Sequence, residues 1–339
     1  MKHLLPNVDR YFKAALHVHT TVSDGRMTPE EVKAAYKEQG FQIVAYTDHE
    51  VCIAHHELAD ADFLPLVGYE AAFQNTKEEK FLRKTYHLCF ISKDPANRWQ
   101  VYDPAFVVGN SGKYADQVIC DGFQSRKYSL ALVNDTIAEA NAHGFLVSYN
   151  HPTWSLQDYT DYAGLKGLWG VEVYNNHCLR VGFDDNNSRV YQDLLRQGNH
   201  MCPLATDDFH RRETKDWMGG GWVMIGAEAL EYGSVIRAME AGSLYASNGP
   251  SIHSLALDGT TLKFSCTDAQ SVLLFTNSRH AKEFKADGSM IQSGEFDLAP
   301  WLTYWKEHGQ EENAFIRMVV IGPEGSRAYT RAYWYNELV

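Results

Sequence analysis

Short apolar runs alternate with amphipathic segments along roughly the first 245 residues of the chain. This alternation is typical of β-α units and predicts a mostly parallel sheet. The clearest helix signal is Thr28-Pro29-Glu30-Glu31, which offers an N-cap, a proline at the first helical position and a glutamate at the third, with Gly40 as the stop. Further helices are expected near 131–143 and 188–197. The apolar runs predict strands at 12–19, 41–46, 64–70, 85–91, 145–150, 168–174 and 201–206.

Two stretches depart from this pattern. The periodicity fails over 94–126, which is typical of a lid or binding loop, with disorder as the alternative. Beyond residue 250, short strands alternate with turn signals such as Asp258-Gly259 and Asp287-Gly288, which predicts an all-β region. We therefore expect two domains, 1–249 with the insertion at 94–126, and 250–339.

Composition narrows the class of protein. Of the 339 residues, 45% are hydrophobic and 22% are charged, which is typical of a folded globular chain. The net charge of −12 disfavours a long contact with nucleic acid, so the expected partner is a small molecule. The six cysteines lack framework spacing, and we find no signal peptide and no apolar run long enough to span a membrane, so a cytoplasmic location is expected.

The pair His17 and His19 is the first candidate for chemistry. Alternate side chains of a strand share a face, so two imidazoles separated by one residue point at one spot. Imidazole nitrogens and carboxylate oxygens are ligands of zinc, manganese and iron. Taken alone, the pair is as compatible with a metal-free strand as with half of a metal site.

More residues of ligand type are predicted to lie at or near the carboxyl ends of parallel strands. In an α/β barrel the carboxyl ends of the parallel strands open onto one face, so such residues meet there. The series, in chain order, is His17, His19, Asp24, His49, Glu70, His87, His151, Asp208 and His210. It predicts a metal centre at that face.

The ordered motifs H-x-H, S-D-G, T-D-H, G-x-E, an isolated histidine, N-H-P and D-x-H resemble the polymerase and histidinol phosphatase (PHP) superfamily of metal-dependent phosphoesterases, in its stand-alone type with a C-terminal β domain. The resemblance implies a distorted seven-stranded β/α barrel, a small C-terminal β-sandwich-like domain, and two or three divalent ions, namely zinc, manganese or iron. It assigns His17, His19, Glu70 and Asp208 to a first ion, Glu70, His87 and His151 to a second, and Asp24, His49 and His210 to a third.

Catalytic roles follow from these assignments. Glu70 is suited to bridge two ions, and a hydroxide between them would attack a phosphoryl group. Asp208 is expected beside the same ions. His210 is the candidate proton donor to the leaving group, with a metal-bound water as the alternative.

Three further carboxylates have two interpretations each. Asp48 is expected to hydrogen-bond a ligand histidine, with a turn residue at a strand end as the alternative. Glu172 matches a segment common in the family and equally suits an inward carboxylate held by its neighbours. Asp207 is expected to be a turn residue or to support the ligands, and 219–221 (Gly-Gly-Gly) is expected to be a flexible turn.

Residues that would meet the substrate are proposed from their distance to the motifs. The candidates along the substrate path are Asn175, Asn176 and His177. The candidate phosphate-binding cations are Arg180, Arg211, Arg212 and Lys84, with exposed surface charge as the alternative for each. The candidates for an apolar wall are Trp154, Trp169 and Trp217, with core packing as the alternative.

The expected function is hydrolysis of a small phosphomonoester, such as a nucleotide or sugar phosphate, by a metal-bridging hydroxide. One alternative is hydrolysis of a carboxylic ester, amide or carbamate, because a hydroxide also attacks carbonyl carbon. Another is a non-enzymatic binding protein stabilised by metals. The pocket wall separates the first two: converging Arg or Lys side chains favour phosphate, and an apolar wall favours an acyl group.

Overall fold

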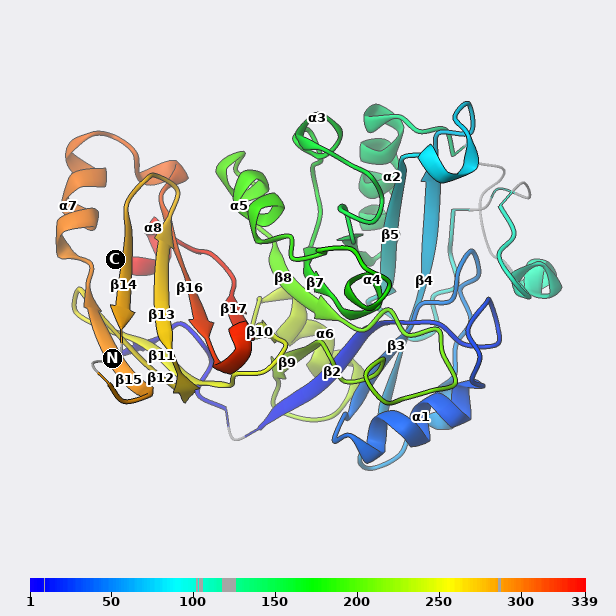
Figure 1. The fold of residues 1–339 in the computed structure, drawn as a ribbon, viewed down its shortest axis with the longest axis horizontal. Coiled ribbons are helices and arrows are strands. Elements are labelled where there is room, and N and C mark those ends of the chain that lie inside the picture. Colours follow the sequence, from blue (N-terminus) through cyan, green and yellow to red (C-terminus); the bar gives the residue numbers. More distant parts are fainter. Residues whose placement is uncertain (9, 102, 104–105, 118–125, 286–287) are drawn as a thin grey trace.

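The computed structural model describes the chain except for residues 9, 102, 104–105, 118–125 and 286–287. The fold is mixed α/β, with one large sheet and a separate, mainly β region formed by the C-terminal part of the chain (Figure 1). In the described part of the chain, no helix has both the length and the apolar character that crossing a bilayer requires.

The elements alternate much as the sequence predicts. The helices are α1 (Pro29–Glu38), α2 (Leu130–Ala142), α3 (Tyr159–Tyr162), α4 (Asn176–Arg180), α5 (Ser188–Arg196), α6 (Tyr232–Glu240), α7 (Ala299–Glu307) and α8 (Tyr335–Leu338). Short 3-10 helices are η1 (His56–Leu58), η2 (Lys80–Leu82), η3 (Ser111–Gln117), η4 (Glu311–Asn313) and η5 (Pro323–Gly325). Helix α1 begins as expected, because the Thr28 side chain accepts from the Glu31 backbone N–H and the Glu31 side chain accepts from the Thr28 N–H.

The large sheet runs through both parts of the molecule. Its strands, in spatial order, are β14 (Ala281–Lys285), β13 (Ser271–Thr276), β16 (Phe315–Ile321), β17 (Arg327–Thr330), β10 (Leu244–Ser247), β9 (Trp222–Gly226), β2 (Tyr11–Val18), β3 (Ile43–Tyr46), β4 (Leu64–Gln74), β5 (Thr85–Ser92), β6 (Phe145–Asn150), β7 (Gly170–Asn175) and β8 (Cys202–Thr206), and β18 (Tyr333–Trp334) pairs with β16. A smaller sheet has the order β1 (Lys2–His3), β11 (Ile252–Asp258), β12 (Thr261–Ala269) and β15 (Ile291–Asp297).

Strand direction departs from the prediction at β5. Strands β2, β3 and β4 are parallel, as are β6, β7 and β8, but β5 is antiparallel to both β4 and β6. The connection 75–84 is too short for the crossover that a parallel pair needs, so β4 and β5 form a hairpin. The expectation of a mostly parallel sheet therefore holds for two blocks of strands. It is wrong at β5 between them and at β9 and β10, since β9 is antiparallel to both β2 and β10.

The segment that follows β8 lies beside the end of β2. Val18 forms a parallel bridge with Phe209, and the His19 N–H donates to the Phe209 carbonyl at 3.0 Å. The two histidines of the first motif and the residues after β8 are thereby brought to the same edge, although almost two hundred positions separate them.

The described part of the C-terminal region contains two helices that the sequence analysis did not anticipate, α7 and the short α8. Helix α7 has a proline in its first turn, and it buries Leu298, Trp301, Leu302 and Trp305, whose spacing matches one helical face. The expectation of an all-β region is therefore correct for its strands and wrong at 299–307 and at 335–338. The N-terminal strand β1 pairs with β11 and so joins this region.

The described part of the insertion 94–126 packs on the loop that carries Asp24. The Asn110 N–H donates to the Ser23 carbonyl at 2.7 Å, and the Asn110 amide donates to the Thr21 carbonyl at 2.9 Å. Gly109 has a φ of +58°, and a Cβ there would lie 2.1 Å from the Ser23 carbonyl oxygen. Residues 102, 104–105 and 118–125 of the insertion lie outside the described residues.

Gly109→Ala tests this contact. The alanine would have to adopt a left-handed backbone and would also clash with Ser23. Gly40→Ala is the control, because Gly40 has a φ of +77° and a Cβ added there would meet no atom within 4 Å. We expect the control to lower the free energy of unfolding in urea by about 1 kcal/mol. Gly109→Ala should lower it by about 1–3 kcal/mol more. Equal losses would contradict the packing of this loop.

Candidate metal centre

The carboxylate of Glu70 lies at the centre of the predicted ligand series. Its Oε1 is 3.3 Å from His17 Nε2, 3.2 Å from His87 Nδ1 and 3.4 Å from His151 Nε2. Its Oε2 is 3.0 Å from His49 Nδ1. Only 1% of the Glu70 side chain is exposed. One buried carboxylate therefore faces imidazoles from four separate segments.

Asp208 is a second shared carboxylate. Its Oδ1 lies 3.3 Å from His17 Nε2, 3.1 Å from His19 Nε2 and 3.4 Å from His210 Nδ1. Because Glu70 Oε2 is also 3.5 Å from His19 Nε2, both carboxylates lie close to the Nε2 atoms of the H-x-H pair.

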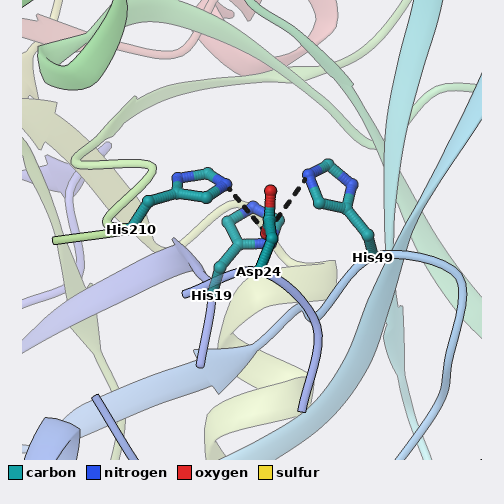
Figure 2. A group of neighbouring side chains, drawn as sticks. All are labelled: His19, Asp24, His49 and His210. Carbon is teal, nitrogen blue, oxygen red and sulfur yellow. Dashed lines mark ion pairs between the residues drawn. The ribbon is translucent and has the colours of Figure 1, made fainter. Parts of the chain in front are cut away.

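A third group lies nearer the surface and is drawn in Figure 2. Asp24 Oδ1 is 3.4 Å from His210 Nε2 and 3.9 Å from His49 Nε2, and the His19 ring lies between them. The ligand atoms of His19, Asp24, His49 and His210 lie within 4.8 Å of one another, as do those of His17, His19 and Asp208 and those of Glu70, His87 and His151. The structure thus brings all nine predicted residues together.

Glu70 and His87 reach this site differently from the prediction. Glu70 lies in the middle of β4, which continues to Gln74 along its hairpin partner. His87 lies near the amino end of β5 and pairs with Ala72 and Asn150. Because β5 is antiparallel, its amino end lies at the same edge as the carboxyl ends of β6 and β7. His87 therefore reaches the site from the amino end of a reversed strand, and not from the carboxyl end of a parallel strand as predicted.

The backbone is strained at two of the nine residues. His151 has a φ of 27° and Asp208 a φ of 50°, in the left-handed region that side chains with a Cβ rarely adopt. Such strain persists only where the surroundings hold it, and it is common at functional sites.

Several buried nitrogen and oxygen atoms of the cluster have no hydrogen-bond partner among the described residues. They are His17 Nε2, His19 Nδ1 and Nε2, His49 Nδ1, Glu70 Oε2, His87 Nδ1 and Asp208 Oδ1. Leaving a buried polar atom unpaired costs about 1–3 kcal/mol, so a folded protein rarely gathers seven such atoms without a further partner. Imidazole nitrogens and carboxylate oxygens facing one another fit divalent metal ions.

The protonation states largely suit metal binding. Burial, together with the neighbouring His210, lowers the pKa of His19, and burial lowers the pKa of His49 to about 4, so both imidazoles are neutral near pH 7. Burial alone would raise the pKa of the Glu70 carboxyl, but the surrounding histidines hold it well below its usual range. Metal ligands must be deprotonated, and these three groups already are.

His17 and His151 carry protons in the metal-free protein. Burial disfavours their charged forms, but nearby carboxylates outweigh it: they raise the pKa of His17 well above its usual value and that of His151 to about 9. Asp208 contributes to both shifts. Metal binding therefore has to displace these protons.

Glu172 hydrogen-bonds to two of the predicted ligands, His17 and His151. Its Oε1 accepts from His17 Nδ1 at 2.6 Å and from the Thr206 hydroxyl at 2.7 Å, and its Oε2 accepts from the His151 N–H and the Asn175 amide, both at 2.9 Å. These contacts agree with the second interpretation, in which Glu172 is an inward carboxylate held by its neighbours. Through its bond to Nδ1, Glu172 orients His17 toward Glu70.

Asp48 does not make the expected hydrogen bond to a ligand histidine among the described residues. Its carboxylate accepts from the Thr20 N–H and hydroxyl at 2.7 and 2.8 Å, and from the Ser23 N–H and hydroxyl at 3.0 and 2.8 Å. That expectation is wrong because the loop 20–23 folds back over Asp48, and its N–H and hydroxyl groups donate to both oxygens of the Asp48 carboxylate. Asp48 positions the loop that carries Asp24.

Asp207 fixes a loop that was expected to be flexible. Its two oxygens accept from the N–H groups of residues 219, 220 and 221 at 2.6, 2.8 and 3.1 Å, and from the Tyr36 hydroxyl at 3.0 Å. Burial raises the pKa of Asp207 to about 6 in spite of these bonds. The prediction that the glycine triplet is a flexible turn is therefore wrong.

The predicted substrate residues separate into two groups. Asn175 donates to Glu172 at 2.9 Å and to Asp208 at 3.3 Å, and Asn176 is buried with its amide on the Asp216 carbonyl. Both support the site and do not line the cavity, and the exposed Arg180 does not line it either. His177 and Arg211 do line it.

A cavity of about 350 Å³ opens beside the ligands. Its lining residues are Asp24, Arg26, His49, Glu70, His87, His151, Trp154, His177, Cys178, Asp208, His210 and Arg211. The sequence analysis missed Arg26, whose signal was its position two residues after Asp24. Of the other candidates, Trp154 lines the cavity and Trp169 does not.

Two candidate cations are used elsewhere. Lys84 pairs with Asp158 at 2.9 Å and with Asp161 at 2.7 Å, and Arg212 lies 3.5 Å from Glu31. Trp217 packs against Arg211, whose guanidinium lies 4.3 Å from the centre of its ring.

Comparison with solved structures found low similarity over long stretches. A two-domain protein from Bacteroides vulgatus that contains a predicted PHP-like metal-dependent phosphoesterase is 14% identical, with a TM-score of 0.46, over 98% of both chains. An amidohydrolase from Chromobacterium violaceum with bound sulfate is 18% identical, with a TM-score of 0.37, over 59% of this chain and 88% of that one.

Sequence comparison gives the family. A curated relative, the DNA polymerase III subunit alpha of Campylobacter jejuni, is 26% identical over 214 residues, which are 58% of this chain but only 16% of the relative's length. The model of the PHP domain family matches residues 15–197, more than half of the chain and all but two of the nine clustered residues. The chain therefore belongs to the PHP domain family.

Proposed function

We propose that this protein is a metal-dependent phosphoesterase that hydrolyses a small phosphomonoester. The observation that carries the proposal is the lining of the cavity, which combines His49, Glu70, His87 and Asp208, each with an unpaired imidazole or carboxylate atom, with two arginines, Arg26 and Arg211. Metal ligands alone are compatible with several hydrolytic reactions. Two cations at the same opening favour a substrate with a doubly charged phosphate.

The residues have distinct roles in this proposal. His17, His19, Asp24, His49, Glu70, His87, His151, Asp208 and His210 would hold two or three divalent ions, of zinc, manganese or iron. Such ions, when bound, supply Lewis acidity and activate water as a nucleophile. Glu70 and Asp208 each lie within 3.5 Å of imidazoles from several segments, which suits a site with more than one ion.

The overall reaction replaces one P–O bond by another. Water supplies the new P–O bond, the ester P–O bond breaks, and the leaving alcohol takes a proton. His210 is poorly placed to donate it, because its Nδ1 is 2.8 Å from the Asp208 carbonyl and its Nε2 faces Asp24. We therefore assign His210 to metal binding. Water is then the group that donates the proton to the leaving alcohol.

Phosphate fits the cavity better than an acyl group. Guanidinium groups bind phosphate oxygens through two charged hydrogen bonds, whereas a carboxylic ester or amide offers no such charge. The open cavity also argues against a purely structural metal site, because structural sites are closed by protein ligands.

We also infer that β2 to β8 form the distorted seven-stranded barrel of the family. The contact of Val18 and His19 with Phe209 supports this inference, because it joins the first of these strands to the segment after the last.

The reaction is tested by a turnover screen of metal-reconstituted protein on phosphomonoesters, phosphodiesters and carboxylic esters. We expect phosphomonoesters to react fastest. Asp208→Asn should lower kcat/KM by at least about a hundredfold, because it removes a charge shared by two groups of ligands. Asp193→Asn is the control, since Asp193 is equally buried but pairs with Arg189 outside the site. Turnover of carboxylic esters alone would overturn the proposal.

The phosphate-binding role predicts a specific effect on KM. Arg211→Ala should raise KM for a phosphomonoester about tenfold, since a charge-assisted hydrogen bond is lost. Arg212→Ala should leave KM unchanged, because this neighbouring arginine does not line the cavity. Equal effects of the two substitutions would show that general surface charge, and not a phosphate contact, is responsible.

Metal binding at pH 7 should release protons. His17 and His151 have raised pKa values and are protonated there in the metal-free protein, so about two protons should leave when metal binds, and metal affinity should increase as the pH rises toward 9. Calorimetric titration in two buffers of different ionisation enthalpy measures this number. His151→Ala should lower it by about one, and His200→Ala, remote from the site, should not change it. A heat independent of the buffer would contradict the prediction.

A further inference from the structure

Trp154 forms an aromatic wall at one side of the metal centre. The centre of its ring lies 5.1 Å from that of His151, nearly perpendicular at 86°, and 5.5 Å from that of His87. The side chain is 36% exposed and lines the cavity. A half-exposed tryptophan beside a polar site offers a bound molecule a large flat apolar surface, and covering it would stabilise the complex.

The turn that carries Trp154 is held in place. The Trp154 N–H donates to Asp185 Oδ2 at 3.1 Å, and the Thr153 hydroxyl donates to Asn187 Oδ1 at 2.8 Å. The Ser155 N–H donates to the His151 carbonyl at 3.1 Å. The turn is therefore tied to the 185–187 segment and to a predicted metal ligand, and the ring is positioned before any substrate binds.

Trp217 provides an internal comparison. Both tryptophans contact histidine rings, but the guanidinium of Arg211 also lies over the ring of Trp217, 4.3 Å from its centre, and so covers it. No lysine or arginine of the described residues lies over the ring of Trp154 in this way.

The two sides of the cavity differ in charge. Arg26 and Arg211 accompany the group of Asp24 and His210, since the Arg26 N–H donates to the His210 carbonyl at 3.1 Å. Trp154 lies beside the group of His87 and His151. A phosphate bound between the metal ligands and the guanidinium groups would leave the rest of the molecule to extend along the aromatic side.

We propose that Trp154 is a specificity-determining residue that stacks on a flat aromatic or heteroaromatic ring in the leaving group of the substrate. The inference rests on the proposed phosphoesterase function and narrows it, since a sugar or polyol phosphate has no flat π-face. Aromatic stacking prefers offset or edge-on contact with a flat partner, and a saturated ring of similar size does not reproduce it.

Binding of three phosphonates, which are not hydrolysed, tests the proposal on the Mn²⁺-loaded protein by calorimetry. Phenylphosphonate should bind about tenfold more tightly than methylphosphonate or cyclohexylphosphonate. Trp154→Ala should remove this preference while changing the Kd of methylphosphonate less than about twofold, and Trp154→Phe should retain most of it. Tyr304→Ala, a similarly exposed aromatic on α7, is the matched control and should have no effect.

The outcomes separate the two proposals. If all three phosphonates bind equally, or if Trp154→Ala weakens them all alike, the ring subsite is overturned while the phosphoesterase function stands. If cyclohexylphosphonate matches phenylphosphonate, the wall is merely apolar, and the stacking proposal is overturned. If no phosphonate binds and no phosphomonoester is hydrolysed, the proposed function itself fails.

Discussion

The structure of the site depends on the burial of Glu70 among four histidines. A carboxylate removed from water is stable only when charged or hydrogen-bonding groups surround it. The imidazoles of His17, His49, His87 and His151 come from four different segments, and each lies within 3.4 Å of a Glu70 oxygen. Any change that moved one segment would leave a buried charge with fewer partners. The same arrangement leaves nitrogen and oxygen atoms unpaired, which suits bound cations.

Three more buried carboxylates fix segments around this centre by hydrogen bonds, and each fixes a different segment. Glu172 orients His17 and the His151 backbone, Asp48 folds the loop that carries Asp24, and Asp207 holds the glycine loop 219–221. Each of them accepts four hydrogen bonds in place of the water it loses, which is why burial is tolerated. The lining of the cavity is uneven, with Arg26 bonded to the His210 backbone and Trp154 packed against His87 and His151.

Much of the fold and of the ligand series was predictable from the sequence because it is local. The capping signal at Thr28, the apolar runs of the strands, and motifs placed directly after them require only nearby residues, and α1, β6 and α5 lie within a residue or two of their predicted bounds. Helix α7 shows the limit of local patterns. Its apolar residues have helical spacing, but the turn signals around it favour short strands. The nine candidate ligands were recognisable because their residue types and order are specific.

The sequence by itself determined which side chains have the chemistry to bind metal, since composition and motif order do not depend on packing. Only the tertiary structure decided how they meet. The reversal of β5 brings His87 into the site, Asp48 receives its donors from a loop that folds back over it, and Arg26 joins the cavity through the His210 backbone. These contacts join residues far apart in the chain, and their partners depend on strand direction and loop path, which no local pattern encodes.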